Sequence, residues 1–147
     1  MSIGCLTERR PVGHTSVKGS RDKVVYICSP HYASSDLEHE SNVIITQNYG
    51  RLAIEQGFTP LIPHLYIPNL VGGDKGEARA KGLSMACALL RKCDVVWVCG
   101  DKITRGMRCE IEEANLNEIR IDYVNIGYKT ILTKPLNPIL ARFIKLS

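Results

Sequence analysis

The chain has 147 residues, the length of one domain rather than two. Hydrophobic residues make up 44% of it and charged residues 23%, which excludes a wholly disordered, collagenous or coiled-coil chain. The formal net charge is +4, but no basic run and no interleaving of basic with aromatic residues accompanies it, so we expect no nucleic-acid partner.

The six cysteines form no Cys-x-x-Cys pair, and none of the histidines lies at zinc-finger spacing from two of them. We therefore expect reduced and mostly buried thiols, with no metal and no cofactor. The first 22 residues lack the apolar core of a signal peptide, and no stretch approaches the roughly 20 apolar residues of a membrane span. These features predict a cytoplasmic protein without a membrane partner, in which residues 1–22 form a flexible extension and residues 23–147 a single domain.

The first elements alternate between strand and helix. A β-branched run halted by Ser-Pro predicts a buried parallel strand over Lys23–Pro30, and apolar residues at helical spacing predict a helix over Ser41–Gly57. A second short strand is expected over Phe58–Pro63. The next segment, His64–Gly76, contains one proline and three glycines and is predicted to be a loop long enough to act as a lid.

The second half of the chain continues this alternation. In chain order we expect a helix, a strand, a helix and a strand over Glu77–Lys92, Asp94–Gly100, Gly106–Asn117 and Ile119–Val124. A fifth strand near Thr130–Thr133 is expected to follow. Asn137 and Pro138 suit the N-cap and first position of a last helix that ends near Leu146.

Such alternation is typical of an α/β protein with a parallel sheet between two layers of helices. We predict a three-layer α/β/α sandwich with a flavodoxin-like sheet of about five strands in the order 2-1-3-4-5. Ligands of such sheets bind beyond the carboxyl ends of the strands, where the strand order reverses. Three segments are expected to meet there, namely residues 28–32, 63–64 and 100–110.

The last of these segments leads into a helix and carries the strongest candidate chemistry. Free backbone N–H groups at the helix start, the Thr104 hydroxyl and the close backbone approach allowed by Gly106 suit a phosphate. Glu110 is expected in the first helical turn or just beyond it, where the positive helix end favours a carboxylate that could attack an electrophilic carbon. The alternative is an ordinary capping box, with Thr104 or Gly106 as the cap.

Three further polar residues allow two interpretations each. His64 is either a ligand contact or a loop histidine with its hydrogen bonds satisfied. Arg79 either grips a phosphate or lies on the surface, and Asn42 either contacts ligand or caps a helix.

Four motifs in order along residues 23–125 resemble those of the nucleoside 2-deoxyribosyltransferase-like superfamily, in particular its small uncharacterised bacterial and phage members. They are YICSP, PHL, LLRKCDVVWVCG and Thr104-x-Gly106-Met107-x-x-Glu110-x-x-x-Ala114. The segment that ends at Glu110 also resembles the helix start of nucleoside-monophosphate phosphoribohydrolases, whose chemistry is N-glycosidic too.

The resemblance implies a nucleoside or nucleotide N-glycosidic hydrolase or (deoxy)ribosyltransferase. The carboxylate at Glu110 would attack C1′ of the sugar and release the base, and water or a second base would resolve the glycosyl-enzyme. Thr104 and Gly106 would hold the 5′ end or its phosphate, while Ser29 and His64 would line the pocket. A homo-oligomer, dimeric or higher, is also implied, with a nucleoside or nucleotide-like small molecule as ligand.

The candidate site residues lie in these motifs or beside the expected site. Glu110 is the catalytic candidate, and the substrate-binding candidates are Ser29, Pro30, His31, Asn42, His64, Arg79, Gly100, Asp101, Thr104, Gly106 and Met107.

One position departs from the superfamily pattern. Many of its enzymes have an Asp eight residues before the position of Asp94, where it moves the proton of the leaving base, whereas this chain has Ala86. Because such proton transfer contributes about 10²–10⁴-fold to a rate, two hypotheses stay open. Another acid (Asp74, Glu77 or Asp101) replaces it in an enzyme, or the protein senses or sequesters a nucleotide-type ligand with little or no catalysis.

Overall fold

The computed structural model describes residues 22–72 and 75–126. Within them, an all-parallel sheet of four strands has the order β2-β1-β3-β4. The strands are β1 (Val24–Cys28), β2 (Thr59–Leu61), β3 (Val95–Cys99) and β4 (Arg120–Val124). This confirms the predicted α/β class and the first four positions of the predicted order. The predicted fifth strand and last helix lie outside the described residues, as does most of the predicted extension.

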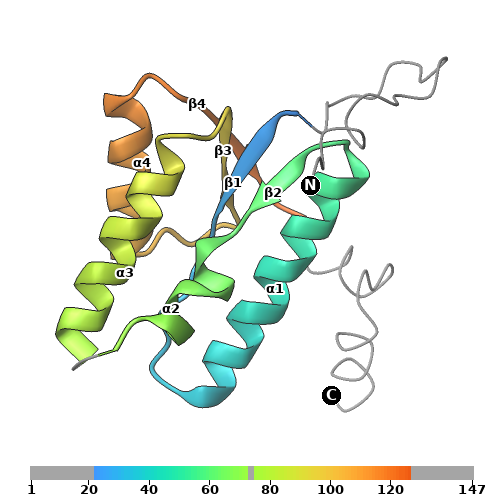
Figure 1. The fold of residues 1–147 in the computed structure, drawn as a ribbon. Helices are drawn as coiled ribbons and strands as arrows, with labels where there is room; N and C mark the ends of the chain where they lie inside the picture. The colour runs from blue at the N-terminus through green and yellow to red at the C-terminus, as the bar shows by residue number, and fades with distance from the viewer. Residues whose placement is uncertain (1–21, 73–74, 127–147) are drawn as a thin grey trace, which may run out of the picture.

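Helices cover both faces of the sheet (Figure 1). Alternate residues of a strand point to opposite faces, so the continuous apolar runs of β1 and β3 supply two cores. Val25, Ile27, Val95, Trp97 and Cys99 pack with α1 (Asp36–Glu55) on one face. Tyr26, Cys28, Val96 and Val98 pack with α3 (Lys75–Leu90) and α4 (Arg105–Leu116) on the other. Three layers follow directly from this alternation.

Helix α1 begins five residues earlier than the predicted start at Ser41. Ser35 is its N-cap and accepts a hydrogen bond from the Glu38 backbone N–H, while the Glu38 carboxylate accepts from both the N–H and hydroxyl of Ser34. These reciprocal bonds stabilise a helix start within a polar segment that shows no apolar periodicity. Asn42 therefore lies inside the helix, and the interpretation of this residue as a cap is wrong.

The segment expected as one loop after β2 contains two short helical elements. These are a 3₁₀ turn, η2 (Pro63–Leu65), and the helix α2 (Ile67–Leu70). Ile67 is buried against α3, where its Cγ2 would lie 3.7 Å from a Cβ built on Gly82. The packing makes this segment a wall beside α3 rather than an extended loop.

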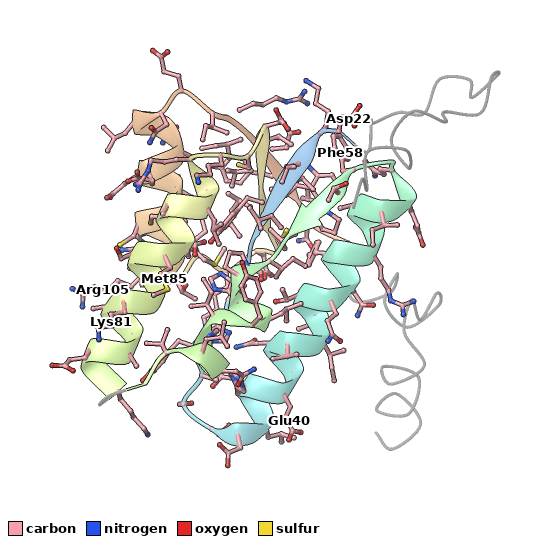
Figure 2. All side chains as sticks on the ribbon, in the orientation of Figure 1. Asp22, Glu40, Phe58, Lys81, Met85 and Arg105 are labelled. Atoms are coloured by element: carbon pink, nitrogen blue, oxygen red, sulfur yellow. The ribbon has the colours of Figure 1, made fainter. Side chains whose placement is uncertain are left out.

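On the outer sides of α3 and α4, side chains point into solvent. Figure 2 shows Lys81 and Met85 pointing from α3 away from the sheet, and Arg105 likewise from α4. Among the described residues, no helix combines the length and apolarity needed to cross a membrane.

Leu90 of α3 is fully buried in the core between the sheet and α4. We expect Leu90→Ala to lower the free energy of unfolding by about 2–5 kcal/mol, because it removes buried methyl groups and leaves a cavity. Urea denaturation measures this change. Leu116→Ala is the matched control, since this leucine of α4 is 80% exposed and its loss should change stability by less than about 0.5 kcal/mol. Equal effects of the two substitutions would contradict the assigned core.

Candidate active site

A cavity of about 350 Å³ lies beyond the carboxyl ends of β1 and β3, where the strand order reverses. Ser29 and His31 reach it from the end of β1, and His64 from the segment after β2. The start of α4 and one side of α3 complete the wall. The three segments expected to meet at this edge of the sheet each contribute to the cavity.

Glu110 is the buried acid of this cavity. Its side chain is only 1% exposed, and its Oε1 accepts a hydrogen bond of 3.1 Å from the Tyr26 hydroxyl. Nε2 of His64 lies 3.2 Å from the same oxygen, at ion-pair distance but not aligned for a hydrogen bond. Oε2 has no hydrogen-bond partner among the described residues. Because a buried polar atom without a partner is costly, Oε2 is the oxygen that a ligand would satisfy.

The groups that surround this carboxylate stay protonated. Burial, reinforced by the negative charge of Glu110, holds the pKa of the Tyr26 hydroxyl and of the Cys28 thiol far above their usual values. The same two causes raise the pKa of Cys87 to about 11. Tyr26 is therefore protonated at neutral pH and acts as a hydrogen-bond donor to Glu110.

The start of α4 is capped by its own residues. Thr104 is the N-cap, and its hydroxyl oxygen accepts from the Met107 N–H at 3.3 Å, while the Met107 sulfur accepts from the Thr104 N–H. The interpretation of Thr104 as a cap is thus confirmed. The N–H groups of Arg105 and Gly106 have no acceptor among the described residues and stay available to an anion. Glu110 lies in the second turn of α4, beyond the first turn.

Three histidines gather at the mouth of the cavity. The rings of His31 and His64 stack with centroids 5.2 Å apart and an interplanar angle of 11°, and His39 meets His31 edge-on at 5.1 Å. Burial lowers the pKa of His31 to about 4, with the neighbouring rings of His64 and His39 as smaller causes. At neutral pH the His31 ring is therefore uncharged.

Comparison with known proteins places this chain in a family. The family model described as "Domain of unknown function (DUF7768)" matches residues 23–124, which include both sides of the cavity. The chain belongs to this family. A search of curated proteins gave no match. Among solved structures, a 2-desoxiribosyltransferase from Leishmania mexicana is 19% identical with a TM-score of 0.46, and the match covers 71% of this chain. The chain spans 65% of the length of that protein, and the similarity is too distant to transfer residue roles.

Eight of the twelve candidate site residues line the cavity of this DUF7768 domain. They are Ser29, His31, His64, Arg79, Thr104, Gly106, Met107 and Glu110. Ser29 is held in place by a 2.7 Å hydrogen bond between its hydroxyl and that of Thr46 in α1.

The other four candidates lie outside the lining of the cavity: Pro30, Asn42, Gly100 and Asp101. Gly100 has a structural reason for its identity, because its φ of 86° lies in the left-handed region that glycine adopts without strain.

Of the three acids considered as replacements for the missing Asp, the two that the structure describes do not line the cavity. Asp101 and Glu77 are exposed and absent from its lining, and Asp74 lies outside the described residues. Ala86 itself does line the cavity and is 2% exposed. Among the described residues that line the cavity, Glu110 is the only carboxylic acid. The lining also contains two histidines, His31 and His64.

Sequence reasoning did not single out Tyr26, Tyr32 or Lys75 as site residues. Tyr26 shares one face of β1 with Cys28 by strand periodicity. Tyr32 lies in the segment of residues 28–32 expected at the site, whereas Lys75 lies in a polar segment without a pattern that points to a cavity. Among the described residues, no three His, Cys, Asp or Glu side chains are arranged to hold a metal ion.

The lowered pKa of His31 predicts how stability depends on pH. The folded pKa of about 4 lies below the ordinary value of 6.5, so the unfolded chain binds more protons between these values. Stability should therefore fall as the pH decreases from about 6.5 toward 4. We expect His31→Gln to lose less unfolding free energy between pH 7 and pH 5 than the parent protein, as measured by urea denaturation. Identical losses would contradict the buried, neutral state of this ring.

Proposed function

We propose that this protein cleaves or transfers the N-glycosidic bond of a nucleoside or nucleotide, with Glu110 as the nucleophile. The observation that supports this most is the state of Glu110, which is a buried carboxylate with one oxygen bonded to Tyr26 and the other unpartnered in the described structure. A cavity of about 350 Å³ is within the range that holds small-molecule ligands.

The two carboxylate oxygens are suited to different tasks. Tyr26 donates to Oε1 and fixes the orientation of the carboxylate, while Oε2, a buried oxygen without a hydrogen-bond partner among the described residues, would form the bond to C1′ of a sugar. In the first step the bond between Oε2 and C1′ forms, the bond between C1′ and the base nitrogen breaks, and the electron pair stays on the base. Water or a second base then attacks C1′ and releases Glu110.

His64 is the polar group best placed to assist. Its Nε2 lies 3.2 Å from Oε1 of Glu110, and its ring stacks on His31 at the mouth. In this position His64 would be the group that accepts a proton from the water that resolves the glycosyl-enzyme.

A second function, ligand binding without turnover, is favoured by the side of the cavity that α3 forms. On α3 the residues that line the deep part of the cavity are Gly82, Leu83 and Ala86, none of which moves a proton. A protein that senses or sequesters a nucleotide-like ligand would need the same cavity without the chemistry.

Glu110→Gln decides between these functions. If Glu110 is the nucleophile, this substitution should reduce free-base release from a panel of nucleosides and nucleoside monophosphates by at least about 10³-fold, because an amide does not form the glycosyl-enzyme. Chromatography of the released bases measures the effect. Glu112→Gln, which changes an exposed acid two residues along the same helix, should keep the parent rate.

Two outcomes would contradict the enzymatic function. One is base release that survives Glu110→Gln. The other is a ligand-induced thermal shift without base release by the parent, which would favour the binding protein.

The start of α4 predicts a preference for 5′-monophosphates over nucleosides. Gly106 lines the cavity, and a Cβ on it would meet no protein atom within 4 Å, so the first turn of α4, with its free Arg105 and Gly106 N–H groups, begins beside open space. Gly106→Val should therefore fill ligand space without a clash and abolish the preference, as measured by isothermal titration calorimetry. Gly72→Val is the control, because Gly72 also has open space but does not line the cavity. Equal affinities of the parent for nucleosides and monophosphates would contradict the phosphate role.

A further inference from the structure

The α3 wall of the cavity changes in character along its length. Six residues at helical spacing line it, namely Lys75, Ala78, Arg79, Gly82, Leu83 and Ala86. The two cations lie at the start of the helix, and the residues nearer to Ala86 are apolar or glycine. With a rise of 1.5 Å per residue, the positions of Lys75 and Ala86 are about 16 Å apart along the helix. One end of this wall therefore carries positive charge and the other carries none.

Arg79 is exposed and contacts an aromatic ring that also lines the cavity. Its guanidinium carbon lies 3.8 Å from the centre of the Tyr32 ring, which belongs to the segment after β1. Such a cation–π contact orients the guanidinium and leaves its N–H edge unoccupied. Within the described residues, neither Arg79 nor Lys75 forms an ion pair with a carboxylate.

The space beside this pair of cations is polar. A second hollow of about 270 Å³ adjoins the cavity, and His31, Tyr32 and Lys75 line both. The hollow also contains Asp36, whose carboxylate is the negative group on that side, together with Ser34, Ser35 and His39. The neutral His31 ring adds no positive charge that would compete with Arg79 and Lys75 for an anion.

We propose that Lys75, Arg79 and Tyr32 form a subsite for an anionic substituent on the leaving base, such as a ring carboxylate. The subsite rests on the proposed function only for the orientation of the ligand. With C1′ at Oε2 of Glu110, the 5′ end lies toward the start of α4, and the base extends along α3 toward its cationic end.

The charge distribution also explains how a base could leave without an acid on α3. When the bond between C1′ and the base nitrogen breaks, the electron pair and its charge move into the base. Lys75 and Arg79 stabilise negative charge at the far edge of the ring, whereas the apolar residues near Ala86 offer no proton. A uracil-type base leaves as an anion and then takes its proton from solvent, whereas a pyridinium base becomes neutral at its ring nitrogen and needs no proton.

Two matched pairs of ligands test the subsite. Nicotinic acid mononucleotide has a carboxylate where nicotinamide mononucleotide has an amide, and 5-carboxyuridine 5′-monophosphate adds a carboxylate to uridine 5′-monophosphate. Both members of each pair carry the 5′-phosphate, so a difference between them reports the base substituent alone. Affinities are measured by isothermal titration calorimetry with the full chain carrying Glu110→Gln, which prevents turnover.

We expect the carboxylate to strengthen binding about tenfold or more in at least one pair, the range of a charge-assisted hydrogen bond. Arg79→Gln or Lys75→Gln should remove most of this preference. Lys81→Gln is the control, because it removes the same charge from the same helix but at a side chain that points away from the sheet (Figure 2). That variant should keep the preference.

The outcomes separate the subsite from the proposed function. Equal affinities within both pairs, no binding of any of the four ligands, or a preference that survives Arg79→Gln and Lys75→Gln, would each overturn the subsite. Base release by the parent is measured separately. If the parent releases base without a carboxylate preference, only the subsite is wrong. A preference without base release supports the subsite and refutes the nucleophile.

Discussion

The candidate site depends on keeping one carboxylate almost completely out of water. Glu110 is 1% exposed, and a buried carboxylate is costly unless its oxygens are bonded. Tyr26 meets half of that requirement from β1, one of the two inner strands, on the face of the sheet where α4 packs. Burial of the tyrosine keeps its hydroxyl protonated, so the bond persists, and the second oxygen is left for whatever enters the cavity.

The sheet order places these groups together. Because β1 and β3 are neighbours with parallel directions, the chain leaves both strands at the same edge and turns toward opposite sides. The segment after β1 brings His31 and Tyr32 to the mouth, and the segment after β3 brings the start of α4. Helix α3, between β2 and β3, forms the wall that joins them. The cavity is thus a consequence of topology, and its charges are a consequence of the side chains on α3 and α4.

Sequence reasoning predicted what periodicity and turn chemistry encode. The apolar runs predicted β1 and β3, and the Thr104-x-Gly106 turn predicted both the cap of α4 and the place of Glu110 near it. The start of α1 was missed because its capping bonds join Ser34, Ser35 and Glu38 in a segment with no apolar pattern. Tyr26 was missed because a strand buried on both faces does not reveal which side chain meets an acid 84 residues away. The contact between Arg79 and Tyr32 depends on tertiary packing alone.

The sulfur of Met107 in the cap of α4 has an electrostatic consequence. In α1 the first turn contains Asp36 and Glu38, and in α3 it contains Glu77, so their own acids offset the partial positive charge of each helix start. A thioether closes the capping box of α4 without bringing a negative charge, and the first turn of α4 contains no acid. The dipole of α4 is therefore left uncompensated by its own residues, at the wall of the cavity that contains Glu110.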